Sequence, residues 1–389
     1  MTSMVAHSEN VLPAGIRSRF VSGVNGLTVH ILEAGFETPD RPLLLLLHGF
    51  PELAYSWRKV MPRLAQAGYY VVAPDVRGYG RTSGADVNYD SDPAPYSTLN
   101  KTRDAVWLVS ALGYRSVAAA IGHDAGAGIA AWCALARPDV FRSVVMMTAP
   151  FGGAPQLPFN TADGGAGGAP PASRASGMSS ELAALSPPRK HYQAYYSTRE
   201  ANENMWHSPQ GVQAFLRGYY HHKSADWKQN RPFPLRGLTA DELAKLPKYY
   251  VMDLDKGMAE TVAEEMPSAA EIAGCAWLTD HELAVYAEEY GRNGFQGGLQ
   301  GYRLGTSGIN TAELSLFSGR TIDVPSCFIS GASDWGSYQN PGGLERMRDS
   351  ACTQFRGIQL IEGAGHWVQQ EQPEQVSALL LEFLREQGD

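Results

Sequence analysis

The stretch Gly122-His123-Asp124-Ala125-Gly126 has the glycine–any–nucleophile–any–glycine pattern of a nucleophile elbow, with aspartate where serine is usual. The apolar run Val117 to Ile121 precedes it and predicts a buried strand. The small, apolar run Gly126 to Ala136 follows it and predicts a helix. Small residues are needed beside the nucleophile because the turn leaves no room for larger side chains. The stretch therefore predicts a strand, a sharp turn that presents Asp124, and a helix.

An aspartate nucleophile restricts the chemistry of the predicted site. A carboxylate that attacks a carbonyl carbon would form a reactive anhydride, whereas attack on a saturated carbon with a leaving group forms an ordinary alkyl ester. A carboxylate also needs no base to activate it. We therefore expect an enzyme in which Asp124 displaces oxygen or halide from saturated carbon.

The composition indicates a globular protein with a core domain and an inserted domain. The chain has 389 residues, of which 44% are hydrophobic and 19% charged, which allows a sizeable core. Its net charge of −8 gives no general basic surface for nucleic acid, and no apolar run is long enough to cross a bilayer. The polar N-terminus does not resemble a signal peptide, and the four widely separated cysteines are expected to be free thiols. We expect a cytoplasmic protein without nucleic-acid or membrane partners.

Apolar runs alternate with helical patterns in the first part of the chain, which predicts a mostly parallel sheet. The predicted strands are Leu43 to Leu47, Tyr69 to Ala73, Val117 to Ile121 and Val144 to Thr148, and the predicted helices are Tyr55 to Ala67 and Thr98 to Leu112. The pattern then breaks. The stretch Gly152 to Ser180 is rich in Gly, Ala, Pro and Ser and predicts an exposed loop. From Pro187 to about Arg303 the chain is rich in aromatic residues and is expected to be mainly helical.

Strand–helix alternation resumes near the C-terminus. The predicted elements there are the strands Val324 to Ser330 and Gln354 to Ile361 and the helix Pro373 to Arg385. We expect residues 1–150 and 319–389 to form one core domain, and residues 151–318 to form a linker loop and a helical insert.

Asp124, Asp334 and His366 each follow a predicted strand, in the chain order nucleophile, acid, histidine. Taken alone, Asp334 could be a helix N-cap and His366 a loop histidine. Reactive side chains at the carboxyl ends of parallel strands are expected to converge at one edge of the sheet. His366 would then activate a water that hydrolyses the ester, and Asp334 would orient the imidazole.

The turn His48-Gly49-Phe50-Pro51-Glu52 follows the first predicted parallel strand. In this arrangement the backbone N–H groups of Phe50 and Ala125 would form an oxyanion hole for the Asp124 carbonyl oxygen. Glu52 is expected to serve the local structure rather than the chemistry.

These motifs, with Asp75-Val76-Arg77-Gly78-Tyr79-Gly80 and the Gly-His-Trp sequence that contains His366, resemble the epoxide hydrolase branch of the α/β-hydrolase superfamily over nearly the whole chain. The resemblance implies an α/β-hydrolase core, with helices on both faces of a mostly parallel sheet, and an inserted, mainly helical cap domain. It implies that an epoxide and water react through a hydroxyalkyl ester of Asp124 to give a vicinal diol.

Epoxide hydrolases of this branch carry two cap tyrosines that donate protons to the epoxide oxygen. The segment His191 to Tyr196 resembles the first tyrosine motif and marks Tyr192, with Tyr195 left open as the alternative. The segment Gly294 to Arg303 resembles the second motif and marks Tyr302. No metal-binding or phosphate-binding motif is found in the sequence, so neither a metal nor a cofactor is predicted.

The chain departs from its relatives at two positions beside the expected reaction centre. Many relatives have tryptophan after the nucleophile and an aromatic residue before the second tyrosine, whereas this chain has Ala125 and Gly301. Both changes remove bulk, so we expect an enlarged pocket for a bulky or aromatic epoxide.

Two other classes of protein remain as alternatives. Haloalkane and haloacid dehalogenases also use an aspartate nucleophile, but Phe50 and Ala125 have no side-chain donor for a halide. A non-catalytic binding protein on this fold would be expected to lack a member of the triad. A homodimer is compatible with the sequence, which does not predict an oligomeric state.

Overall fold

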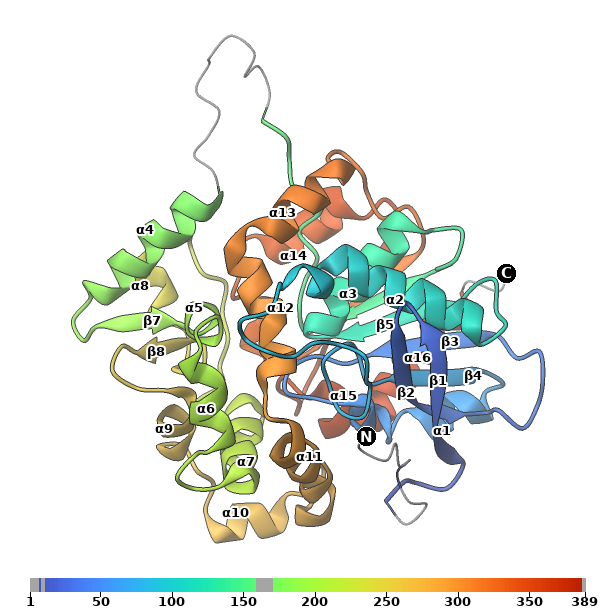
Figure 1. Ribbon diagram of the computed structural model, residues 1–389, viewed down its shortest axis with the longest axis horizontal. Coiled ribbons are helices and arrows are strands. Elements are labelled where there is room, and N and C mark those ends of the chain that lie inside the picture. Colours follow the sequence, from blue (N-terminus) through green and yellow to red (C-terminus); the bar gives the residue numbers. More distant parts are fainter. Residues whose placement is uncertain (1–6, 8–10, 159–170, 387–389) are drawn as a thin grey trace.

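The computed structural model describes His7, residues 11–158 and residues 171–386. An eight-stranded sheet forms its centre, with the strand order β1-β2-β4-β3-β5-β6-β9-β10 (Figure 1). β1 and β2 pair antiparallel with each other, as do β2 and β4, and the other neighbours are parallel. The strands are β1 (Ile16–Val24), β2 (Leu27–Ala34), β3 (Leu43–Leu47), β4 (Tyr70–Pro74), β5 (Ala119–His123), β6 (Val144–Met147), β9 (Ser326–Gly331) and β10 (Phe355–Ile361). The predicted mostly parallel sheet is confirmed.

Helices cover both faces of this sheet, which explains why its central strands are continuously apolar. Successive side chains of a strand point to opposite faces. In β3, Leu44 and Leu46 accordingly join the core beneath α1 (Met61–Gln66) and α16 (Pro373–Arg385). Leu43, Leu45 and Leu47 join the core beneath α2 (Thr98–Ala111) and α3 (Ala125–Ala136).

The insert between β6 and β9 is mainly helical, as expected, and lies beside the sheet (Figure 1, green to orange). Its helices are α4 (Pro171–Ala183), α5 (Tyr192–Tyr196), α6 (Glu200–Trp206), α7 (Val212–Lys223), α8 (Ala240–Leu243), α9 (Met258–Ala263), α10 (Ala269–Gly274), α11 (Asp280–Asn293), α12 (Gln296–Ser307) and α13 (Ile309–Leu314). A short antiparallel pair that was not predicted, β7 (Arg189–His191) with β8 (Val251–Asp253), lies among them.

Several predicted elements differ from the structure. The segment Tyr55 to Ala67 is not one helix but the 3-10 turn η1 (Ala54–Trp57) followed by α1. The predicted loop Gly152 to Ser180 is wrong from Pro171 onward, where α4 begins. The Ala residues of α4 favour a helix, and proline is well tolerated at its first position. Residues 159–170 of that loop lie outside the described residues.

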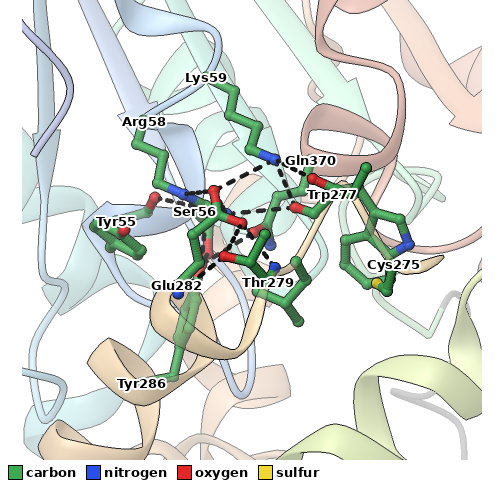
Figure 2. Close-up of polar contacts among 12 residues, drawn as sticks. Tyr55, Ser56, Arg58, Lys59, Cys275, Trp277, Thr279, Glu282, Tyr286 and Gln370 are labelled. Carbon is green, nitrogen blue, oxygen red and sulfur yellow. Dashed lines mark hydrogen bonds and ion pairs between the residues drawn. The ribbon is translucent and has the colours of Figure 1, made fainter. Parts of the chain in front are cut away.

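The insert is joined to the core by a buried polar cluster around Arg58, shown in Figure 2. Arg58 follows η1 and is 1% exposed, and its Nη2 lies 2.9 Å from Oε1 of Glu282 on α11. Its Nη1 donates to Oε1 of Gln370, 2.7 Å away, on α15 (Val368–Glu371). Lys59 Nζ donates to the carbonyl oxygen of Trp277 over 2.7 Å. Three segments that are far apart in the sequence are thus held together at one point.

The structure also bears on the cysteines and on membrane crossing. All four cysteines are free, as predicted. Within the described ranges, no helix combines the length and the apolar character that a membrane span requires.

Candidate active site

Asp124 lies at the sharp turn between β5 and α3, with φ of 51° and ψ of −121°. Positive φ is uncommon for a non-glycine residue and is found in turns and, as stored strain, at functional sites. The flanking glycines permit the turn because a Cβ on Gly122 would overlap the carbonyl oxygen of Gly126, and one on Gly126 would overlap that of Leu47. The local sequence therefore folds into the predicted strand, turn and helix.

The Asp124 carboxylate is held by one of the two predicted backbone donors. The N–H of Phe50 donates to Oδ2 of Asp124 over 3.0 Å. Ala125 is the first residue of α3 and lines the same cavity as Asp124. In the part of the chain that the structure describes, its N–H makes no hydrogen bond to this carboxylate.

His366 and Asp334 are brought together by the neighbouring parallel strands β9 and β10. Nδ1 of His366 lies 3.1 Å from Oδ1 of Asp334, and both side chains are 2% exposed. Asp334 is held in turn by the N–H of Gly336 at 2.8 Å and the hydroxyl of Ser330 at 3.1 Å. The second ring nitrogen of His366, Nε2, is buried and has no hydrogen-bond partner among the described residues, so it can accept a proton.

The surroundings of His366 favour its neutral form. Burial lowers the pKa of His366, and the positive charge of Lys223 lowers it further, against the opposing effect of Asp334 and Asp124. Lys223 Nζ lies between 4.9 and 5.7 Å from the centres of four aromatic rings. These rings belong to Tyr219, Tyr249, Tyr250 and Trp367. No local sequence pattern indicates this role of Lys223, because it depends on contacts between distant segments.

His123 and Glu52 form a second buried pair beneath the site. Nδ1 of His123 lies 2.5 Å from Oε2 of Glu52, and its Nε2 lies 2.7 Å from the carbonyl oxygen of His366. Burial opposes the ionisation of Glu52, but His123 holds the pKa of Glu52 at about 2. Glu52 raises the pKa of His123 in turn, despite its burial. The pair links the turn after β3 to the His366 loop, a role of His123 that sequence reasoning missed. A histidine within an apolar strand was the available signal.

Tyr192 and Tyr302 line one cavity together with Asp124. Their ring centres are 5.9 Å apart, and burial raises the pKa of both phenols, which keeps them protonated as donors. Tyr195 is buried as well, but it is not among the described residues that line this cavity. Lys190 Nζ lies 4.7 Å from the centre of the Tyr195 ring instead.

The cavity has a volume of about 520 Å³, and residues of both the core and the insert line it. Ala125 and Gly301 both lie on its wall, where larger side chains would reduce it. Among the described residues, no group of three or more His, Cys, Asp or Glu side chains is arranged to hold a metal ion.

The sequence is similar to one protein family and to several curated proteins over most of its length. The family described as alpha/beta hydrolase fold matches residues 42–373. Epoxide hydrolase A of Mycobacterium tuberculosis is 31% identical over 363 residues, which are 92% of this chain and 95% of that protein. The epoxide hydrolase of Caballeronia sordidicola is 29% identical over 93% of this chain and 92% of its own length.

Solved structures are similar over the same extent. An epoxide hydrolase from an endophytic Streptomyces has a TM-score of 0.74 and 29% identity, covering 96% of each chain. Potato (Solanum tuberosum) epoxide hydrolase I has a TM-score of 0.70 and 28% identity, covering 95% of this chain and 99% of its own.

Proposed function

Because the chain belongs to the alpha/beta hydrolase fold family and is an epoxide hydrolase, we propose that it opens its epoxide by forming a covalent ester with Asp124. The observation that carries this proposal is the position of the Asp124 carboxylate. It lies in a cavity that is also lined by Tyr79, Tyr192 and Tyr302, and its Oδ2 accepts a hydrogen bond from the N–H of Phe50 at 3.0 Å.

In the first step, Asp124 attacks one carbon of the epoxide ring, and the bond from that carbon to the ring oxygen breaks. Tyr192 and Tyr302 hydrogen-bond the ring oxygen, and one of them gives it a proton as negative charge develops. The product of this step is a hydroxyalkyl ester of Asp124 and a tyrosinate, which recovers its proton from solvent.

In the second step, Nε2 of His366 removes a proton from water, and the resulting hydroxide attacks the carbonyl carbon of the ester. Asp334 stabilises the imidazolium that forms, through the 3.1 Å contact at Nδ1. The N–H groups of Phe50 and Ala125 stabilise the oxyanion. The tetrahedral intermediate collapses as His366 protonates the leaving oxygen, which releases the vicinal diol. The carboxylic acid of Asp124 then loses its proton to solvent, which restores the carboxylate and offsets the proton that the tyrosinate took up in the first step.

We infer that the substrate is bulky or aromatic, since the cavity of about 520 Å³ is bounded by Ala125 and Gly301. A panel of epoxides graded by size tests this inference. Rising kcat/KM with substrate size supports it, and turnover of small aliphatic epoxides alone contradicts it.

The decisive experiment is the intact mass of the His366→Gln variant after exposure to an aryl epoxide. This variant is expected to form the ester and fail to hydrolyse it, so its mass increases by that of the whole epoxide. The double variant with Asp124→Ala is the control and gains no mass. An alkyl adduct from haloalkanes, with none from any epoxide, would instead indicate a dehalogenase.

A further inference from the structure

We propose that Lys101 forms a subsite for a carboxylate group of the substrate, at a distance from the reacting carbon. This inference rests on the proposed function, since it concerns the same cavity. Lys101 lies in the first turn of α2, and it lines the cavity together with Asp124 and Tyr302. A Cβ added to Gly301 would lie 3.2 Å from Nζ of Lys101, so the ammonium group stands directly beside α12 at the cavity wall.

The ammonium group of Lys101 is not neutralised by the protein. Asp104 on the same helix is the carboxylate that acts on its charge, but Asp104 is already bound by two other side chains. Arg77 donates to it from Nε at 2.8 Å and from Nη2 at 2.6 Å, and Asn25 Nδ2 donates at 2.6 Å. In the described ranges, no hydrogen bond or ion pair involves Nζ of Lys101.

An unpaired ammonium in a partly dehydrated site is unfavourable, and burial lowers the pKa of Lys101 to about 8. A bound anion would supply the missing partner and favour the charged form. Among the described residues that line the cavity, Lys101 is the one cation and Asp124 the one carboxylate. A single positive charge fits a singly charged carboxylate better than a phosphate dianion.

The geometry therefore points to an epoxide that carries a carboxylate at its far end. The carboxylate would pair with Lys101, and the chain between the two groups would place the epoxide against Asp124. Gly301 contributes by leaving room for the lysine, which gives this departure from the relatives a second consequence.

The test uses terminal-epoxy carboxylic acids of increasing chain length, each compared with its own methyl ester. At a matching length, the acid is expected to have the higher kcat/KM. In Lys101→Met the kcat/KM for the acid divided by that for the ester is expected to fall about tenfold to a hundredfold, the usual effect of losing a hydrogen bond to a charged group. Lys228→Met removes an exposed lysine and serves as the matched control, in which the ratio stays as in the wild type.

Equal kcat/KM for acid and ester at every length, or a preference that survives in Lys101→Met, overturns the subsite. If Lys101→Met does not fold, inhibition of the wild-type enzyme by saturated carboxylates and by their primary amides gives the same answer. Stronger inhibition by the acids supports the subsite, and equal inhibition overturns it. The ester mechanism is tested separately, because the His366→Gln adduct forms with a neutral epoxide whether or not Lys101 binds anions.

Discussion

Lys223 is expected to control the protonation of His366 through its charge. Its ammonium is buried among aromatic rings and lowers the pKa of His366. Replacing Lys223 with Met removes that charge, so the pKa of His366 is expected to rise. Because only the neutral imidazole accepts a proton, the acid limb of the kcat profile should then move to higher pH. A profile that keeps its acid limb while the rate falls uniformly would indicate a role in packing alone.

The two candidate first tyrosines can be separated by removing single hydroxyl groups. Tyr192→Phe and Tyr302→Phe each remove a phenol from the cavity, and each is expected to lower the rate of ester formation about a hundredfold. Tyr195→Phe removes a hydroxyl outside the cavity, which cannot give a proton to the ring oxygen. This variant should therefore keep the rate of ester formation within about twofold. Rapid-quench measurement of the ester gives the three rates. A large loss in Tyr195→Phe with none in Tyr192→Phe would exchange the two assignments.

At the level of elements, α15 holds the loop that carries His366. Oε2 of Glu371 accepts the N–H groups of Ala225 at 2.8 Å and Gly365 at 2.9 Å, and its Oε1 accepts that of Trp367 at 3.0 Å. The carboxylate thus fixes the residues on both sides of His366 and ties them to the insert.

We expect Glu371→Gln to slow ester hydrolysis about tenfold. In glutamine an NH2 group replaces one carboxylate oxygen and cannot accept a hydrogen bond, so at least one buried backbone N–H group is left unpaired. Ester formation should be unaffected, since Asp124 is on another element. Single-turnover kinetics separates the two steps, and Glu374→Gln on the exposed face of α16 is the matched control. Burial raises the pKa of Glu371 to about 7, so the wild type should lose the same contacts as the pH falls below 7.

The sequence predicted elements best where one physical signal dominates. β3 is a run of five leucines buried on both faces, and α16 begins with proline and has a regular apolar stripe. Both have the predicted bounds. The β1–β2 hairpin was missed, although Asn25 and Gly26 between its strands are a strong turn signal. Its edge position leaves polar residues in β1, which obscure the alternation.

The same contrast holds for the candidate site. The elbow, Asp334 and His366 are each marked by a short local motif, and they follow β5, β9 and β10 of the same sheet. Lys101 and Lys223 carry no such motif, because the proposed role of each depends on a residue far along the chain, Gly301 for Lys101 and His366 for Lys223. These two lysines could therefore be recognised only from the folded structure.

At the scale of the whole molecule, the Arg58 cluster in Figure 2 joins core and insert. Glu282→Ala would leave the buried guanidinium of Arg58 without its carboxylate, which is expected to lower the free energy of unfolding by about 3 kcal/mol. Glu374→Ala breaks the exposed pair with Arg63 and should cost less than about 1 kcal/mol. Urea denaturation measures both. Similar losses in the two variants would contradict the importance of the buried cluster.

The Arg58 cluster also bears on how the chain divides. It connects residues before 150, within 151–318 and after 319, and we propose these as the limits of the two core parts and the insert. Location in the cytoplasm and assembly as a homodimer stay predictions.

The positive φ of Asp124 implies that the residue needed for catalysis lowers the stability of the folded protein. Glycine adopts φ of 51° without penalty, whereas strain of this kind costs about 1 to 3 kcal/mol in another residue. We therefore expect Asp124→Gly to be inactive yet to melt at a higher temperature than the wild type, and Asp124→Asn to be inactive without that gain. Calorimetry of the two variants distinguishes them. Without selection for catalysis, the change Asp124→Gly would make the protein more stable. We therefore expect related chains that have lost the activity to lose this nucleophile early.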